Sequence, residues 1–172
     1  QPCLYEVGML WQENKISVAQ EHLASGIVTR LMAVINSKIE VSPDSGKRAL
    51  VTAAPNEYHE IGAWMVSDML EQSDWDVRYL GANTPKEDLV KIAQEFIPDI
   101  LFLSVTMPFN IPFVKDIIGL LRAEPVGHYT RVMVGGRPFI ENVELWKSTG
   151  ADGFAANAKD AAQLAESWRS DA

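Results

Sequence analysis

Short apolar runs alternate with longer amphipathic segments from residue 49 onward. The short runs have the length of strands, and the longer segments repeat their apolar positions every three or four residues, as helices do. This alternation predicts a parallel sheet covered by helices on both faces, with right-handed crossovers. We therefore expect an α/β fold, with a flavodoxin-like (Rossmann-like) five-stranded parallel sheet of order 2-1-3-4-5. Strands are expected at 49–54, 76–80, 100–105, 131–134 and 152–155, and helices at 60–72, 85–97, 110–123, 139–149 and 158–168.

Residues 1–40 have a helical pattern without strand-like runs. A first helix is expected over residues 4–14, and a second begins at an N-cap, Ser17, with Glu21 in its first turn. The second helix has an apolar face formed by Val18, Leu23, Ile27, Leu31, Val34 and Ile35. Two helices cannot bury two apolar faces without partners. We therefore expect part of a helical-bundle cap, completed by a longer chain or by another chain.

A polar segment with Pro and Gly, residues 41–48, separates the two patterns and predicts a linker. Residues 49–172 are then expected to form the Rossmann-like domain. Within it, Thr84 before Pro85 predicts an N-cap with proline in the first helical turn.

Composition excludes several classes of protein. The formal net charge is −8 with no Lys/Arg-rich run, which argues against direct nucleic-acid contact. The single cysteine excludes an internal disulfide framework, and the three histidines are too scattered for a zinc site. No apolar run approaches the roughly 18 residues that span a bilayer, and no signal peptide is recognisable. We expect a cytoplasmic protein without membrane contact.

Candidate chemistry begins in the stretch 50–62, LVTAAPNEYHEIG, which indicates a strand, a loop and a helix. In open parallel sheets, ligands bind at the carboxyl ends of strands, near the point where strand order reverses. His59 lies at such an end. Glu57, two residues earlier, can hold one ring nitrogen and leave the other for a metal. Considered alone, His59 is more simply a loop histidine bonded to nearby backbone.

Two neighbouring strands end in further candidates. Ser104 and Thr106 follow the third predicted strand, and Gly135-Gly136 follows the fourth. Each has a simpler explanation alone, because a hydroxyl can satisfy backbone groups and a glycine pair can make a tight turn. Together with His59 they predict a crevice with a metal-capable imidazole, hydroxyl donors and a wall without side chains. A flat, bulky group would fit there.

This combination resembles the cobalamin-binding family, whose signature is D-x-H-x-x-G, then S-x-L or S-x-T, then G-G. Here it stands as Glu57-x-His59-x-x-Gly62, Ser104-x-Thr106 and Gly135-Gly136, within residues 48–168. The resemblance implies that His59 replaces the dimethylbenzimidazole base below cobalt. It also implies that the displaced base is buried beside the serine and the glycines. Glutamate replaces the family's aspartate, and its longer arm still reaches the imidazole.

A second motif, Trp11-x9-Glu21-His22, resembles the CarH/LitR-type light-sensing cobalamin domains. The resemblance implies that Trp11 covers a 5′-deoxyadenosyl group and that Glu21 accepts from its ribose hydroxyls, with His22 nearby. Without the downstream signature, bundle core, a first-turn acid and a solvated histidine would explain them. Gln12 stands where members of the group have a histidine that binds cobalt from above. Glutamine is a poor cobalt ligand, so water or hydroxide is expected there after photolysis, unless His22 substitutes.

The expected function is that of a light-sensing module that binds adenosylcobalamin, and not an enzyme. Photolysis would move the helical cap and signal to an effector outside this chain, as in transcription regulation, or alter a homo-oligomer. The alternative is a corrinoid carrier of a methyltransferase system, which has no need of Trp11 and Glu21 as an adenosyl pocket. A response-regulator-like domain is a third class. It would require a phosphoacceptor aspartate where the first predicted strand ends in Ala53-Ala54-Pro55.

Overall fold

The computed structural model describes residues 2–38 and 46–170. Residues 1, 39–45 and 171–172 lie outside this description, and most of the predicted linker, 41–48, falls among them. Contacts along the chain define two compact units, residues 1–40 and 41–172. None of the helices in the described ranges combines the length and apolar character that crossing a membrane requires.

The first unit is a pair of helices, α1 (Pro2–Gln12) and α2 (Val18–Asn36). Ser17 is the N-cap of α2, as predicted, and forms a capping box with Gln20. Although α1 and α2 contact each other, no residue of α2 is buried. The predicted apolar face is more than half exposed at every position, namely Val18, Leu23, Ile27, Leu31, Val34 and Ile35. Within the described residues, α1 therefore does not cover this face.

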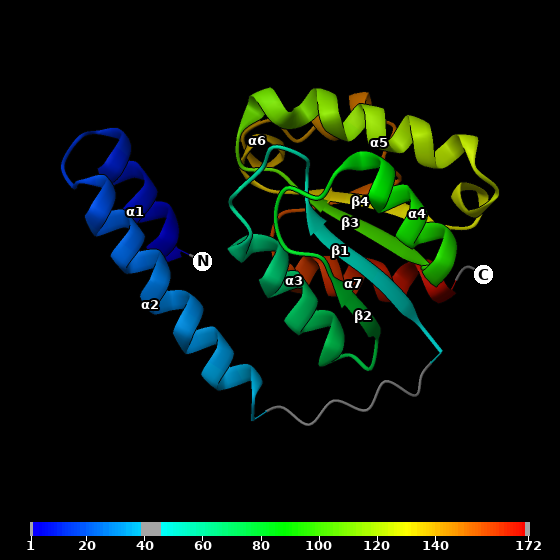
Figure 1. The fold of residues 1–172 in the computed structure, drawn as a ribbon, viewed down its shortest axis with the longest axis horizontal. Helices are drawn as coiled ribbons and strands as arrows, with labels where there is room; N and C mark the ends of the chain where they lie inside the picture. The colour runs from blue at the N-terminus through cyan, green and yellow to red at the C-terminus, as the bar shows by residue number, and fades with distance from the viewer. Residues whose placement is uncertain (1, 39–45, 171–172) are drawn as a thin grey trace. The chain divides into compact units, whose positions relative to one another are not determined.

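The second unit contains a five-stranded parallel sheet in the order β2-β1-β3-β4-β5, which confirms the predicted flavodoxin-like topology (Figure 1). The strands are β1 (Arg48–Ala53), β2 (Asp76–Tyr79), β3 (Ile100–Ser104), β4 (Arg131–Gly135) and β5 (Gly153–Ala155). In the register of the ladder, Ala53 pairs with Ser104 and Ser104 pairs with Gly135. The carboxyl ends of β1, β3 and β4 therefore lie side by side.

Helices cover both faces of this sheet (Figure 1). One apolar core lies between the sheet and α4 (Lys86–Phe96), α5 (Ile111–Ala123) and α6 (Arg137–Glu141). The other core lies between the sheet and α3 (Ile61–Glu71) and α7 (Ala158–Ser170). Since both faces of β1 and β3 are buried, their side chains are apolar almost throughout, as doubly covered parallel strands require.

Two local predictions were wrong. The helix expected at 139–149 is divided into α6 and a 3₁₀ helix, η3 (Leu145–Thr149). The break is at Asn142, whose backbone is extended and whose Oδ1 accepts from the backbone N–H of Glu144. The N-cap of α4 is Pro85 rather than Thr84, and no side chain caps this helix. Thr84 Oγ1 instead lies 3.4 Å from Thr52 Oγ1.

Candidate functional site

A buried carboxylate organises the loop that follows β1. Glu57 is 1% exposed, although it lies in a connection between a strand and a helix. Its Oε2 accepts from the backbone N–H groups of Thr106 and Met107, both at 2.9 Å, and from Asn110 Nδ2 at 3.1 Å. Its Oε1 accepts from the His59 backbone N–H at 3.2 Å and lies 2.5 Å from His59 Nδ1. The carboxylate therefore ties the end of β1 to the end of β3.

This environment keeps Glu57 ionised. Burial alone would raise the pKa of its carboxyl. Hydrogen bonds from His59, Met107, Thr106 and Asn110 more than offset burial and lower the pKa to about 2. A carboxylate that is charged at neutral pH is an effective acceptor for the Nδ1–H of an imidazole.

The His59 ring is oriented by that contact. Its side chain is 56% exposed, in contrast to the buried carboxylate behind it. With Nδ1 donating to Glu57, the tautomer is fixed and Nε2 is the basic nitrogen that would coordinate a metal. Among the described residues there is no cluster of three or more His, Cys, Asp or Glu side chains arranged to hold a metal ion. The chain thus offers one imidazole to a metal that brings its other ligands with it.

Ser104, Thr106 and Gly62 line the same edge of the sheet. Ser104 is 4% exposed at the end of β3. Gly62 lies in the first turn of α3, where an added Cβ would be 3.4 Å from Ser104 Oγ. Thr106 donates its backbone N–H to the Glu57 carboxylate, and the use of its hydroxyl toward a bound group stays a prediction. The hydrogen bonds that Glu57 accepts within the described chain do not include one from Ser104.

The glycine pair is required by close backbone approach. A Cβ at Gly135 would lie 2.8 Å from Phe102 Cζ and 3.0 Å from the Ala155 carbonyl oxygen. Gly136 has φ +111°, and a Cβ there would lie 1.9 Å from the Val105 carbonyl oxygen. The two glycines therefore let the end of β4 lie directly against the chain that leaves β3.

The residues predicted for an upper face lie in the first unit. Trp11 is 43% exposed near the end of α1 and is followed by Gln12. On α2, Glu21 Oε2 lies 2.6 Å from His22 Nδ1, and Ser25 Oγ donates to Glu21 Oε1 at 2.6 Å. The structure thus brings together at one sheet edge the predicted residues Glu57, His59, Gly62, Ser104, Thr106, Gly135 and Gly136. Trp11, Glu21 and His22 belong to the separate helical unit.

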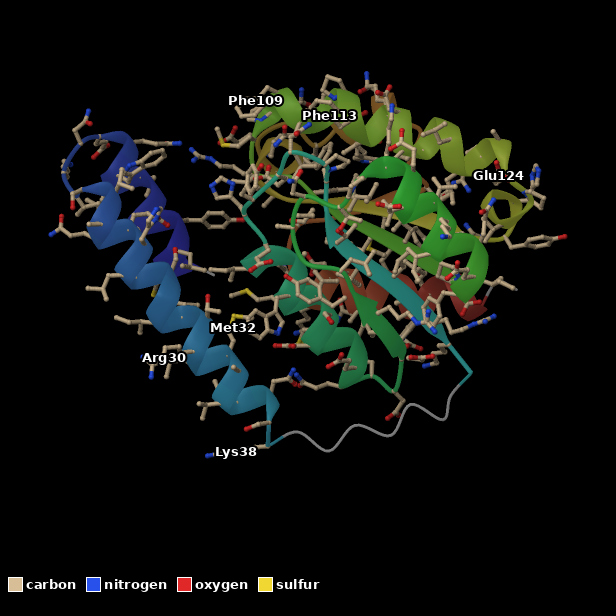
Figure 2. The ribbon with its side chains drawn as sticks, viewed as in Figure 1. Arg30, Met32, Lys38, Phe109, Phe113 and Glu124 are labelled. Carbon is tan, nitrogen blue, oxygen red and sulfur yellow. The ribbon has the colours of Figure 1, made fainter. Side chains whose placement is uncertain are left out.

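Met107 and Asn110 were missed by the sequence analysis. They lie in the connection after β3, and Asn110 ends a short 3₁₀ helix, η1 (Pro108–Asn110), that leads into α5. Figure 2 shows Phe109 and Phe113 at this end of α5, with Glu124 at the opposite end of the helix. The only sequence signal was a polar residue between two prolines, in Pro108-Phe109-Asn110-Ile111-Pro112.

Acid is expected to weaken the folded state through Glu57. Its pKa in the folded chain, about 2, lies below the unfolded value of 4.5, so its stabilising contribution is complete above that value and is lost as pH falls. The difference corresponds to about 3 kcal/mol, of which about 2 kcal/mol would be lost by pH 3. The measurement is urea unfolding of the apo chain between pH 7 and pH 3.

Variants isolate this contribution from that of other carboxyl groups. Glu57→Gln should be less stable than the parent at pH 7 and should lose less stability on acidification. Glu95→Gln, at an exposed position of α4, is the matched control and should follow the parent. Parallel pH profiles for the parent and Glu57→Gln would contradict the assignment.

Comparison with known proteins gives matches over both units. Residues 47–165 match a family model described as a B12 binding domain, and residues 1–36 match a second model with the same description. Dimethylamine corrinoid protein 1 of Methanosarcina acetivorans is 28% identical, covering 94% of this chain and 76% of the relative. Dimethylamine corrinoid protein 3 of Methanosarcina mazei is also 28% identical, covering 94% and 96%. The HTH-type transcriptional repressor CarA of Myxococcus xanthus is 31% identical over 60% of this chain and 34% of its own length.

Solved structures agree on the fold. The monomethylamine corrinoid protein of Methanosarcina barkeri superposes with a TM-score of 0.83 at 24% identity, covering 94% of this chain and 76% of that protein. A cobalamin-binding protein of Desulfitobacterium hafniense has a TM-score of 0.67 at 24% identity, covering 96% and 77%.

The residues of the sheet edge fit a corrinoid. The macrocycle would bring four nitrogen ligands of its own, so a single protein ligand is enough, and His59, an imidazole oriented by a buried carboxylate, would be that ligand. Ser104 and the two glycines lie at the carboxyl ends of β3 and β4, beside the switch point where ligands of open parallel sheets bind. Because the family model covers residues 47–165, most of the chain, this protein belongs to the B12-binding domain family, and its cofactor is a corrinoid.

Proposed function

We propose that this chain is a corrinoid carrier of a methyltransferase system. The observation that supports this most strongly is similarity along 94% of the chain to relatives named as dimethylamine corrinoid proteins. When bound, the corrinoid supplies a cobalt ion that can accept and give up a methyl group. In this role the chain itself contributes binding and orientation, and separate methyltransferase enzymes catalyse the transfers.

Each part of the site has a task under this proposal. Glu57 holds the His59 imidazole by Nδ1, so that Nε2 would be the nitrogen that coordinates cobalt. Gly62, Ser104 and the pair Gly135-Gly136 would lie beside the displaced nucleotide base. The exposed apolar residues on α2, in the first unit, are available to further helices or to a partner.

An adenosylcobalamin light sensor is the second candidate, favoured by the motif Trp11-x9-Glu21-His22 and by the partial similarity to the repressor CarA. The contacts of Glu21 on α2 bear on the light-sensor candidate. Each carboxylate oxygen of Glu21 already contacts a neighbour on its own helix, His22 or Ser25, so a ribose diol would have to compete with them. Gln12 also stands in place of the histidine that would bind cobalt after photolysis.

Binding of two cobalamins distinguishes the candidates. The apo chain is titrated in the dark with methylcobalamin and with adenosylcobalamin. The oligomeric state of each complex is measured from its molar mass before and after illumination. The dissociation constants of a carrier for the two forms should differ by less than about tenfold, which corresponds to about 1.4 kcal/mol. Its oligomeric state should not change in light. A stronger preference for adenosylcobalamin, together with a light-dependent change of mass, would overturn the carrier proposal.

Trp11→Ala adds a control to that experiment. If the indole packs on an adenosyl group, its removal should cost about 1–3 kcal/mol of affinity for adenosylcobalamin alone. Under the carrier proposal, the variant should change the affinities for the two cobalamins equally.

A further inference from the structure

Asn110 is a buried polar residue whose position is explained by Glu57. It is 0% exposed, and its Nδ2 donates to Glu57 Oε2 at 3.1 Å and to the Asn56 carbonyl oxygen at 3.3 Å. Both partners are acceptors only, so chemistry fixes which end of the amide faces them. The backbone N–H of Asn110 donates to the Met107 carbonyl oxygen at 2.9 Å, which closes the turn that presents this side chain.

The amide oxygen of Asn110 lowers the stability of the folded chain. Asn110 Oδ1 is buried without a hydrogen-bond partner among the described residues. A buried acceptor in that state is unfavourable, and an apolar residue of the same volume would avoid the penalty. Folding alone therefore gives little reason for an amide at this position, whereas the contact of Nδ2 with the carboxylate does.

We infer that Asn110 is a positioning residue for cobalt ligation: it holds the Glu57 carboxylate in the orientation that directs His59 toward the metal. The two carboxylate oxygens of Glu57 have different partners. Thr106, Met107 and Asn110 all bind Oε2, which leaves Oε1 to face His59 Nδ1. Of the three groups on Oε2, Asn110 provides the one side chain, so it is the one that substitution can remove without altering the backbone.

Asn110 holds the carboxylate that in turn orients the metal-binding histidine. A carboxylate that turned on its χ3 axis would lose either the imidazole or the backbone amides. The donor from Asn110, which comes from a helix start 53 residues away in the chain, restricts that rotation. Loss of such outer partners typically lowers metal affinity or activity by about 10- to 100-fold.

The test uses cob(II)alamin bound to the full chain at one neutral pH. The chain is labelled with 15N, so a protein nitrogen on cobalt gives a doublet in the electron paramagnetic resonance spectrum, whereas the cofactor's own 14N base gives a triplet. The doublet is the nitrogen splitting followed here, and it reports the fraction of cobalt that carries the His59 nitrogen. Asn110→Leu, which keeps the branching at Cγ but removes the donor, should shift the equilibrium between ligated and unligated His59 by roughly tenfold or more toward the unligated form. Its apo form should melt close to the parent, because the leucine also removes the unsatisfied Oδ1.

Two further variants keep the inference falsifiable. Asn110→Asp retains the shape and places an acceptor against Glu57, so it should shift the equilibrium in the same direction even if the leucine variant fails to fold. Asn83→Gly is the matched control. It removes a side chain that accepts from the Asn56 backbone N–H and donates to Tyr58 Oη, in the same loop, without touching the carboxylate, and glycine tolerates the positive φ of this position. This control should leave the splitting unchanged.

The outcomes separate this inference from the proposed function. It rests on ligation by His59 and not on methyl transfer. An unchanged ligated fraction in both Asn110 variants, with the parent fully ligated, would overturn the positioning role alone. Absence of nitrogen splitting in the parent would overturn the ligand assignment, and the inference with it, whatever the cobalamin preference shows.

Discussion

Substitution of His59 by alanine is expected to replace the spectrum of histidine-ligated cobalt by that of the free cofactor, with its own base bound or unbound, and to weaken cobalamin binding by at least about tenfold. The imidazole is more than half exposed while its Nδ1 is held by a buried carboxylate, the arrangement of a side chain oriented toward a ligand. Removal of the ring would delete the nitrogen that we propose as the cobalt ligand, and the described residues contain no cluster of three or more His, Cys, Asp or Glu that could hold a metal instead. Absorption spectra and equilibrium titration measure both effects.

Two controls make this result specific. His128→Ala removes an exposed histidine of the 3₁₀ helix η2 (Pro125–His128), which precedes β4 and so lies at the opposite edge of the sheet. It should leave the spectrum unchanged. Added imidazole should restore a nitrogen-ligated spectrum to the His59→Ala complex, because the missing ligand is supplied from solution. Equal affinity and equal spectra for the parent and His59→Ala would rule out ligation by this residue.

The sheet was predictable because its strands carry their own signal. The central positions of β1 and β3 are apolar except for Thr52, and the register that follows aligns their ends at the switch point. The pair Glu57 and His59 was predictable for a similar reason, since two side chains separated by one residue in a loop can meet without information from the rest of the fold.

Contacts between distant segments were not predictable in the same way. Asn110 binds Glu57 across 53 residues, and nothing in its local pattern distinguishes it from a helix-start residue exposed to solvent. Thr106 was selected for its hydroxyl, but the backbone N–H that it contributes could have come from any residue other than proline. The predicted helix at 139–149 failed at Asn142, because its side chain offered the backbone a local turn that competes with the helix.

The choice between carrier and light sensor depended on the helical unit. There the spacing of residues says less about their contacts than it does at the strand ends. The motif Trp11-x9-Glu21-His22 was interpreted through resemblance, but the spacing alone does not say what the Glu21 oxygens contact. In the structure they contact His22 and Ser25. A carboxylate on a helix surface can meet partners one turn away, so a motif of this kind is weaker support than the strand-end signature.

Three glycine-to-alanine substitutions are expected to separate what the fold needs from what the cofactor needs. Gly136→Ala should be strongly destabilising, by about 3–5 kcal/mol, or should prevent folding. Its φ of +111° is strained for any residue with a side chain, and the new Cβ would lie 1.9 Å from the Val105 carbonyl oxygen. Backbone must move to relieve that overlap, and the moving segment is the connection that holds Glu57. Thermal and urea unfolding of the apo chain measure the loss.

Gly62→Ala should behave in the opposite way. The position is helical, and the new Cβ would make an ordinary contact with Ser104 Oγ at 3.4 Å, so apo stability should stay the same or rise by about 0.5 kcal/mol. If the displaced nucleotide base binds between α3 and the end of β3, this methyl group should lower cobalamin affinity about tenfold. Gly119→Ala, in α5 with nothing within 4 Å of the added Cβ, is the matched control and should change stability by a similar amount without changing affinity. Equal cobalamin affinities for these two variants would place the nucleotide base elsewhere, and the role of Gly62 would then be limited to packing.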